Sequence, residues 1–306
     1  MVGAGLEKSR RLGYRGALYT GKVSMIIKEY LQTKGYSNKE IKSLLETGKI
    51  FLQGLPISDG RREAKEKDIE IRPRAPKMKP GRDPVLLHRG DGFVVCYKPA
   101  GYLSVRAPNR HKDSNMMGFV YALFGEAHAV HRLDEETSGL MLVALNEQTQ
   151  IRLKEQLERR EIKRYYWAIG SGHLSKAMKI ETYILRNRGD GKRGSIKGNS
   201  RKQEDGQHAV SHFKPIEKLN GATLIQCQLE TGRTHQIRIH LSENRHPILG
   251  ERLYSSPRVA KRSARLALHA YSLSFQDPST GESLLFRVPL PDDLEKLRRQ
   301  LAYKEQ

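Results

Sequence analysis

The sequence predicts an α+β protein in which a large domain, built on a mixed, mostly antiparallel sheet, follows a small α/β module. Three observations lead to this prediction. Strand-like runs of apolar, β-branched and aromatic residues outnumber helical patterns after residue 84. Helical patterns and short strand patterns follow one another within residues 21–72. Residues 73–84 are proline-rich and basic, which predicts an extended linker between the two parts.

The charge of the chain indicates what it binds. Its 306 residues include 55 lysines and arginines against 34 aspartates and glutamates, a formal net charge of +21. Such an excess favours a polyanionic partner, because basic side chains displace counterions from phosphates. Nucleic acid fits better than a membrane surface, since the sequence has no apolar run of about 18 residues and no continuous basic amphipathic helix. The two cysteines lie in apolar runs and argue against a disulfide framework, which fits a soluble protein of the reducing cytoplasm.

The first 72 residues divide into an arm and a module. Residues 1–20 are expected to form a basic arm, with a targeting segment as the alternative. Apolar side chains at helical spacing predict a helix over residues 23–31. Ser37 and Glu40 have the spacing of a capping box, which predicts the start of a second helix.

The second half of the module reads as strands. Gly48 is placed to end the second helix, and residues 49–57 predict a strand that turns at Gly54. Residues 67–71 predict another short strand. Basic side chains around the helix pair are expected to contact nucleic acid: Lys39, Lys42, Lys49, Arg61 and Arg62.

Residues 85–306 form the larger predicted domain. Its strand patterns cover residues 93–97, 140–145, 165–169 and 223–229, and its clearest helix pattern covers residues 148–159. Residues 186–202 combine basic side chains with glycines and predict a basic loop between strands. Such a loop either contacts RNA or is simply solvated, and the composition does not separate the two.

Acidic side chains are concentrated in "HRLDEETSGL", residues 131–140. Asp134 could act as a nucleophile, a base or a ligand, with Arg132 shielding it from substrate phosphates. Thr137 and Ser138 offer hydroxyls that can orient a carboxylate or cap a turn, and Gly139 permits a tight entry into the following strand. The alternative is a solvated turn without catalytic chemistry.

A second cluster is "ETGRTHQIRIH", residues 230–240. Thr234 is expected to cap a helix that carries Ile237 and Leu241 on one face. Arg238 would lie on this helix, where its planar fork could hold a buried carboxylate through two hydrogen bonds.

The histidines of the second half of the chain suggest a metal site, but their spacing argues against one. His235 and His240 are five residues apart, which splays them around a helix, and no HExxH-type pattern occurs. The chain also lacks a phosphate-binding P-loop and a dinucleotide fingerprint. We therefore expect no metal and no cofactor.

The third element is "KRYYWAIG", residues 163–170. Aromatic residues that lead into a strand commonly belong to a core. A tyrosine beside a basic pair could also stack on a nucleic-acid base and carry a proton. The pattern leaves both interpretations open.

Together these stretches resemble the RluA family of pseudouridine synthases. "HRLDEETSGL" matches the family signature His-Arg-Leu-Asp, two variable positions, Thr-Ser-Gly. Four further stretches follow the family order: "YKPAG" at 97–101, "RYYWA" at 164–168, "LETGRTHQIRIHL" at 229–241 with "HPILGERLY", and "LALHAYSL" with "VPLP". Residues 21–72 resemble the RNA-binding domain of the ribosomal protein S-four type.

The resemblance implies the pseudouridine synthase fold and an isomerase that converts uridine to pseudouridine in structured RNA, either rRNA or tRNA, without metal or redox cofactor. It implies that Asp134 is the catalytic carboxylate and that Arg238 pairs with it. Tyr166 is expected to pack on the target base, with Tyr165 as the alternative. Arg132 is expected to fill the space of the flipped base. The expected RNA contacts at the site are Arg132, His131 and Arg233.

A different class of function remains open. The chain could be an RNA-binding ribosome-assembly factor with a vestigial synthase domain, although Asp134, Tyr166 and Arg238 are all present. A cofactor-dependent nucleic-acid enzyme is not supported by any motif. We expect the protein to act as a monomer.

Overall fold

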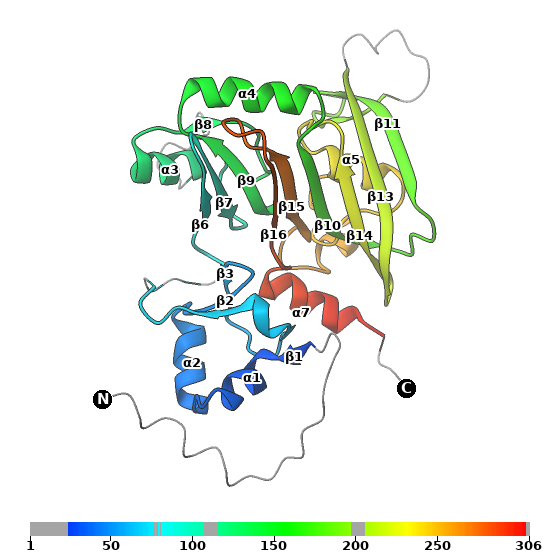
Figure 1. Ribbon diagram of the computed structural model, residues 1–306. Helices are drawn as coiled ribbons and strands as arrows, with labels where there is room; N and C mark the ends of the chain where they lie inside the picture. The colour runs from blue at the N-terminus through cyan, green and yellow to red at the C-terminus, as the bar shows by residue number, and fades with distance from the viewer. Residues whose placement is uncertain are drawn as a thin grey trace, which may run out of the picture.

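The computed structural model describes residues 24–75, 77, 79, 81–106, 115–196 and 206–303 (Figure 1). The predicted arm, residues 1–20, lies outside the described residues, as does the second part of the basic loop 186–202. Within the described ranges, no helix is both long and apolar enough to cross a membrane.

A large mixed sheet carries the second part of the chain (Figure 1). Its strands follow the order β12-β11-β13-β14-β10-β15-β9-β7-β6, with β16 beside β15 and β8 beside β9. Among the described strands, β9 and β15 pair in parallel and the other pairs are antiparallel. The predicted mixed, mostly antiparallel sheet is therefore confirmed. The strand bounds are β6 Val85–Arg89, β7 Phe93–Lys98, β8 His128–Ala129, β9 Ser138–Ala144, β10 Lys163–Ser171, β11 Met178–Leu185, β12 Gly194–Ser195, β13 Gln207–Leu219, β14 Ala222–Leu229, β15 Leu268–Gln276 and β16 Ser283–Arg287.

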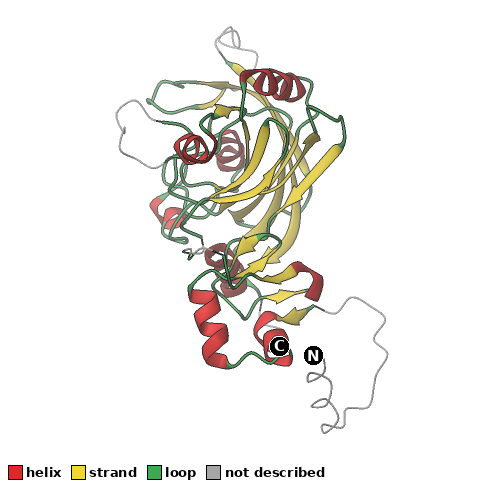
Figure 2. Ribbon diagram, turned by 60° about the vertical axis from the view of Figure 1, so that its left-hand side comes forward, coloured by secondary structure: helices red, strands yellow, loops and turns green. Residues whose placement is uncertain are grey.

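Helices pack around this sheet (Figure 2). The predicted helix over residues 148–159 is present as α4, which Asn146 caps by accepting a hydrogen bond from the Thr149 amide at 2.8 Å. The predicted strand patterns correspond to β7, β9, β10 and β14. The helix bounds are α3 Met116–Phe124, α4 Glu147–Glu158, α5 Gln236–Glu243, α6 Pro257–Ala260 and α7 Asp292–Leu301.

Gly139 allows the central parallel pair to form. It lies opposite Ala270 in the β9–β15 register and has φ 123°. A Cβ atom at this position would lie 2.2 Å from the Ala270 carbonyl oxygen, so only glycine fits. The tight strand entry predicted at Gly139 is confirmed, and it places the loop that carries Asp134 at the middle of the sheet.

Residues 24–72 fold into two helices and short strands around a small core of their own. Ser37 and Glu40 form both hydrogen bonds of the predicted capping box, and Gly48 follows the helix with φ 65°. The first helix begins later than predicted, because Met25 and Ile26 pair with another strand instead. The elements are β1 Met25–Ile26, α1 Ile27–Thr33, α2 Asn38–Glu46, β2 Ile50–Leu52, β3 Leu55–Pro56, β4 Glu63–Ala64, the 3-10 helix Glu66–Asp68 and β5 Ile69–Ile71. The buried side chains are Ile27, Leu31, Ile41, Ile50, Leu52, Ile57, Ala64 and Ile69.

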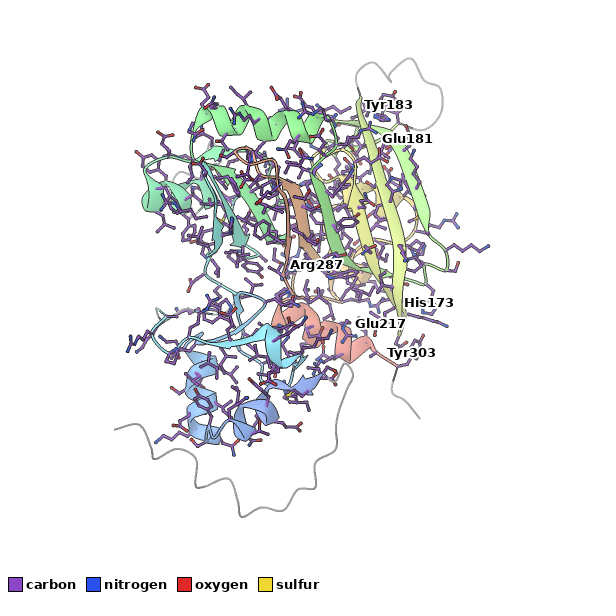
Figure 3. All side chains as sticks on the ribbon, viewed as in Figure 1. His173, Glu181, Tyr183, Glu217, Arg287 and Tyr303 are labelled. Atoms are coloured by element: carbon purple, nitrogen blue, oxygen red, sulfur yellow. The ribbon has the colours of Figure 1, made fainter. Side chains whose placement is uncertain are left out.

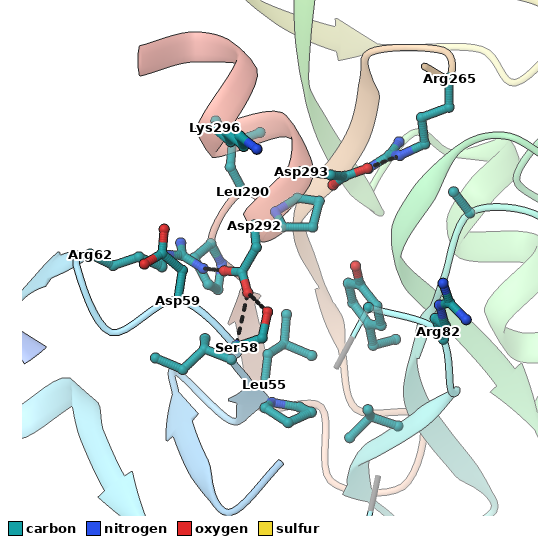
Figure 4. A pocket seen from close by; sticks show the side chains of 18 of the residues that line it. Leu55, Ser58, Asp59, Arg62, Arg82, Arg265, Leu290, Asp292, Asp293 and Lys296 are labelled. Carbon is teal, nitrogen blue, oxygen red and sulfur yellow. Dashed lines mark hydrogen bonds and ion pairs between the residues drawn. The ribbon is translucent and has the colours of Figure 1, made fainter. Parts of the chain in front are cut away.

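These N-terminal elements lie against the large sheet and α7 (Figure 2). Leu55 belongs to the same buried cluster as Val85 and Phe93 of the large sheet. Asp292 at the start of α7 accepts hydrogen bonds from the Ser58 amide at 2.8 Å and from Arg62 Nη1 at 3.0 Å. Figure 4 shows these contacts at a cavity of about 620 Å³ between the two parts. The contacts fix the N-terminal elements relative to the sheet.

The far end of α7 is tied to the sheet as well. Arg298 pairs with Glu217 of β13 at 2.7 Å, and Tyr303 lies 3.4 Å from His173 Nε2. Figure 3 shows Glu217, His173 and Tyr303 together at the edge of the sheet nearest this helix. Helix α7 therefore bridges the large sheet and the N-terminal elements.

Candidate active site

Asp134 lies in the loop between β8 and β9. Hydrogen bonds from buried polar groups hold the backbone of this loop in place. Ser104 Oγ donates to the Leu133 carbonyl oxygen at 2.7 Å and accepts from the Leu133 amide at 2.9 Å. The Thr137 amide donates to the Asp134 carbonyl oxygen at 3.0 Å and closes the turn. The backbone of Asp134 is thereby fixed, while its side chain remains 19% exposed.

Lys98 is a second support of the same loop. Its Nζ donates to the carbonyl oxygens of Pro99 at 2.9 Å, Tyr102 at 2.6 Å and Glu135 at 2.9 Å. The side chain is fully buried, and burial lowers the pKa of Lys98 to about 7. The role of this lysine could not be predicted from the sequence, because nothing in "YKPAG" indicates that three carbonyl oxygens from two loops converge on it.

Arg238 on α5 reaches Asp134 through one nitrogen. Its Nη1 lies 3.5 Å from Asp134 Oδ2. Its Nε and Nη2 donate to the two oxygens of Glu251 at 2.7 and 2.8 Å. The expected pairing of Arg238 with Asp134 is present as one contact. The expected two-bond fork on a buried carboxylate is also present, but that carboxylate is Glu251 and not Asp134.

Glu251 is buried and was missed from the sequence. It accepts further hydrogen bonds from the Leu253 amide at 2.8 Å and the Tyr254 amide at 3.3 Å. Burial by itself would raise the pKa of Glu251. Its hydrogen bonds to Arg238 and to these amides lower the pKa by more, so the pKa lies below its usual value. Glu251 lies within the stretch "HPILGERLY", but the sequence does not show that Arg238 is its partner.

His235 approaches the other oxygen of Asp134. Its Nε2 lies 3.9 Å from Asp134 Oδ1, and its Nδ1 lies 2.7 Å from Tyr254 Oη. Burial lowers the pKa of His235, which favours the neutral ring. His235 has φ 60° and occupies the position before α5, so the prediction that Thr234 caps this helix is wrong.

Tyr166 and Arg164 of β10 face the same pocket as Asp134. Both side chains are buried, and burial raises the pKa of the Tyr166 hydroxyl. Tyr165, the alternative, points to the other face of the sheet, where its ring lies 6.4 Å from Tyr271. The alternation of a strand thus favours Tyr166 over Tyr165.

The pocket around Asp134 is lined by side chains from loops, strands and α5. Thr137 Oγ1 is buried without a partner in the described structure, and Ser138 Oγ lies 2.9 Å from His269 Nδ1. Neither hydroxyl orients the carboxylate, so that part of the prediction is wrong. The lining residues are Arg132, Leu133, Asp134, Thr137, Arg164, Tyr166, Leu229, Gly232, Arg233, His235, Gln236, Ile237, Arg238 and Leu268.

The expected RNA contacts at the site divide into two groups. Arg132 and Arg233 are exposed at the mouth of the pocket. His131 turns inward, where its Nε2 accepts a hydrogen bond from the Leu142 amide at 3.1 Å. Burial lowers the pKa of His131 to about 3, so its ring is neutral and holds the loop instead of contacting phosphate.

The basic residues of the N-terminal elements divide in a similar way. Lys39, Lys42 and Arg61 are exposed, as an RNA contact requires. Lys49 is half-buried, and its Nζ donates to the carbonyl oxygens of Pro73 and Ala75. Arg62 is only 7% exposed and pairs with Asp292, so the expected RNA contact does not fit its position.

Two further histidines of the second half of the chain bond to separate protein groups. His240 bonds to the hydroxyls of Thr182 and Ser211, and the ring of His246 lies 3.1 Å from the Ser171 carbonyl oxygen. Both cysteines are buried and unpaired.

A family model described as RNA pseudouridylate synthase matches residues 92–243. The chain is 33% identical over 282 residues to ribosomal large subunit pseudouridine synthase D of Neisseria meningitidis serogroup A, which covers 86% of this chain and 74% of that protein. It is 30% identical over 287 residues to the protein of the same name from Zymomonas mobilis, which covers 87% of this chain and 89% of that protein.

Solved structures share the fold. Human RNA pseudouridylate synthase domain containing 4 has a TM-score of 0.57 and 24% identity, over 71% of this chain and 92% of that chain. Because the more similar relatives extend across most of this chain and most of their own length, the chain belongs to the RNA pseudouridine synthase family.

Proposed function

We propose that this isomerase, which acts on RNA, modifies ribosomal RNA of the large subunit and uses Asp134 as its catalytic carboxylate. The observation that carries the second part is the convergence of Asp134, Arg238 and Tyr166 on one pocket, from a loop, a helix and a strand. The relatives named for large-subunit modification support the first part.

The charges around Asp134 favour a reactive carboxylate. Arg238 carries one positive charge, and the buried Glu251 already neutralises it through two hydrogen bonds. The single longer contact of 3.5 Å aims Asp134 without cancelling its charge. Asp134 can therefore serve as nucleophile or base while remaining fixed in direction.

The isomerisation breaks the bond from ribose C1′ to uracil N1 and forms a bond from C1′ to C5. One proton leaves C5 and one is gained at N1, so no atom is gained or lost overall. We assign Tyr166 to the wall on which the turned base packs, since its ring is buried beside Asp134. Arg132, exposed at the mouth, is assigned to the space that the flipped nucleotide leaves in the RNA.

The domain organisation is part of the proposal. We assign residues 21–72 to an RNA-binding module of the ribosomal protein S-four type, residues 73–84 to a linker and residues 85–306 to the catalytic domain. Two features support the division: residues 24–72 have a core of their own, and the described residues between β5 and β6 form neither helix nor strand. The exposed side chains of Lys39, Lys42 and Arg61 would contact phosphates.

Replacement of Asp134 tests the catalytic assignment. Asp134→Asn should abolish pseudouridine formation, while RNA binding and the melting temperature stay near those of the wild type. Glu136→Gln is the matched control, because it removes a charge from the same loop and should leave activity intact. Retained activity in Asp134→Asn would refute the assignment.

Mapping pseudouridine in total RNA from cells with and without the gene tests the substrate. A site lost from large-subunit rRNA supports the proposal, and a site lost from tRNA alone contradicts it. If the wild-type protein binds RNA and forms no pseudouridine, the alternative of an assembly factor with a vestigial synthase domain is correct.

A further inference from the structure

Arg164 is a buried cation without a protein counter-charge. Its side chain lies in β10, and the residue is 8% exposed. Among the described residues, no carboxylate lies within ion-pair distance of its guanidinium, and its Nε is buried without a hydrogen-bond partner. A buried charge without a partner lowers the stability of the fold by several kcal/mol unless a ligand supplies the opposite charge.

Other buried arginines of the chain show the usual solution. Arg238 donates to both oxygens of Glu251, and Arg62 pairs with Asp292. Burial lowers the pKa of Arg164, yet a guanidinium stays protonated at neutral pH. Arg164 therefore differs from these residues in keeping an uncompensated positive charge.

Arg164 also lies at a junction. It lines the pocket that holds Asp134 and the neighbouring groove that includes Arg132, Arg160 and Arg233. Within this groove Arg160 already pairs with Glu230 at 2.6 Å, and Arg233 Nε donates to the His208 carbonyl oxygen at 3.0 Å. Arg164 is thus placed between Asp134 and a groove whose lining holds more arginines than glutamates.

Gly232 gives the guanidinium its space. A Cβ atom at this position would lie 2.7 Å from Arg164 Nη1 and 3.5 Å from its Nη2. The glycine leaves that side of the guanidinium uncovered by a side chain, in the wall of the same pocket. The opening suits a ligand that enters from the groove.

We propose that Arg164 binds a phosphodiester group next to the flipped uridine, where the RNA strand passes from the groove into the active-site pocket. This inference rests on RNA as the substrate, but not on which uridine is modified. A phosphate provides the full negative charge that the site lacks and oxygens that match the guanidinium fork. A uracil carbonyl would accept a hydrogen bond and leave the charge uncompensated.

The contact would form only with the nucleotide turned out of its stack, because Arg164 is buried where the groove meets the pocket that would take the flipped base. It would therefore favour the flipped state over the stacked state and help to offset the cost of unstacking. Asp134 and Arg164 would then contact the same nucleotide from two sides.

The test asks whether the effects of one side chain and one phosphate on RNA affinity depend on each other. Affinity is measured for wild type, Arg164→Met and Arg164→Lys with a short RNA that contains the mapped uridine. The same RNA is prepared with an uncharged methylphosphonate in place of the phosphate on its 5′ or its 3′ side. We expect one methylphosphonate to weaken wild-type binding roughly 10- to 100-fold, and to weaken Arg164→Met binding hardly further.

Two controls complete the design. Arg258→Gln removes an exposed charge from α6 and should show the full loss with each methylphosphonate. Methionine fills a similar volume without charge, so Arg164→Met should melt no lower than wild type. If it does melt lower, Arg164→Gln repeats the coupling measurement with another neutral side chain, and Arg164→Lys, which keeps the charge, should retain most of the loss caused by the methylphosphonate.

The inference is overturned if the losses from the substitution at residue 164 and from both methylphosphonates simply add. Conversion of the unmodified RNA by the wild-type protein is measured in parallel. A wild type that converts no uridine refutes the proposed function, whereas conversion with additive losses refutes the role of Arg164 alone.

Discussion

Arg238 donates two hydrogen bonds to Glu251 and directs only its third nitrogen, Nη1, toward Asp134 at 3.5 Å. The fully buried Glu251 therefore sets the direction of the guanidinium, and only one nitrogen is left to face Asp134. Glu251 thus positions Arg238, although Glu251 itself is fully buried and makes no hydrogen bond to Asp134 in the described structure.

Glu251→Gln should lower kcat by roughly 10- to 100-fold with little change in RNA affinity. The amide keeps one hydrogen bond to Arg238 but removes the charge, so the guanidinium is free to shift onto Asp134 and reduce its basicity. Single-turnover kinetics and RNA titration separate the two effects, and Glu251→Asp should restore part of kcat. An unchanged kcat in Glu251→Gln would contradict the positioning role.

His240 should make the protein less stable in acid. Burial lowers the pKa of His240 to about 4, below its ordinary value of 6.5. The unfolded chain therefore binds one more proton between these values, and stability falls as pH falls through this window. At pH 5 the loss is about 2 kcal/mol for this one group.

Urea denaturation at pH 7 and pH 5 measures this contribution. His240→Gln should lose less stability between the two pH values than the wild type, because the replacement cannot be protonated. His173→Gln, which alters an exposed histidine at the edge of the sheet, serves as the control. Equal losses in wild type and His240→Gln would refute the prediction.

Asp292→Ala should release the N-terminal elements from α7. The change leaves the buried Arg62 without its partner and removes the acceptor of the Ser58 amide. Trypsin should then cut after Arg61 and Arg62 roughly tenfold faster, because the segment opens more often.

The neighbouring Asp293 provides the matched control. It pairs with Arg265 inside the large domain at 2.5 Å, so Asp293→Asn removes a charge from the same turn of α7 without touching Arg62. Equal cleavage rates in both variants would show that Asp292 does not hold the N-terminal elements.

The exposed basic residues of the N-terminal elements should set the salt dependence of RNA binding. If Lys39, Lys42 and Arg61 each contact one phosphate, their joint replacement by glutamine lowers the slope of log affinity against log salt by about 2. Fluorescence titrations at salt concentrations from about 50 to 200 mM measure this slope. The triple variant Lys154→Gln, Lys176→Gln, Lys214→Gln removes equal charge from exposed positions of the large domain, and an equal change there would contradict a special role for the module.

Local patterns predicted local structure well. The Ser37–Glu40 capping box, the turn at Gly54 and helix α4 depend on residues a few positions apart, so the sequence carries the whole signal. The choice between Tyr166 and Tyr165 needed the structure, in which Arg164 and Tyr166 line the pocket while the Tyr165 ring lies near Tyr271 on the other face of β10. The cap at Thr234 failed, because the strained backbone of His235 begins α5 without any side-chain cap.

Partners across the fold could not be predicted in this way. Whether Arg62 contacts RNA or Asp292 depends on how the N-terminal elements dock on α7, and no pattern within either segment contains that information. The same holds for Lys98, whose three acceptors come from two loops.

The sequence by itself determined the family, the mixed sheet and the candidate aspartate, because the motifs that identify them are contiguous and Asp134 lies within one. Only the tertiary structure decided how that aspartate is held. Arg238 is 104 residues away in sequence, and its fork goes to Glu251, 13 residues further on, because both side chains are buried at one place. Burial makes each charge depend on its nearest partner, and nearest partners are set by the packing of the sheet and not by the order of residues along the chain.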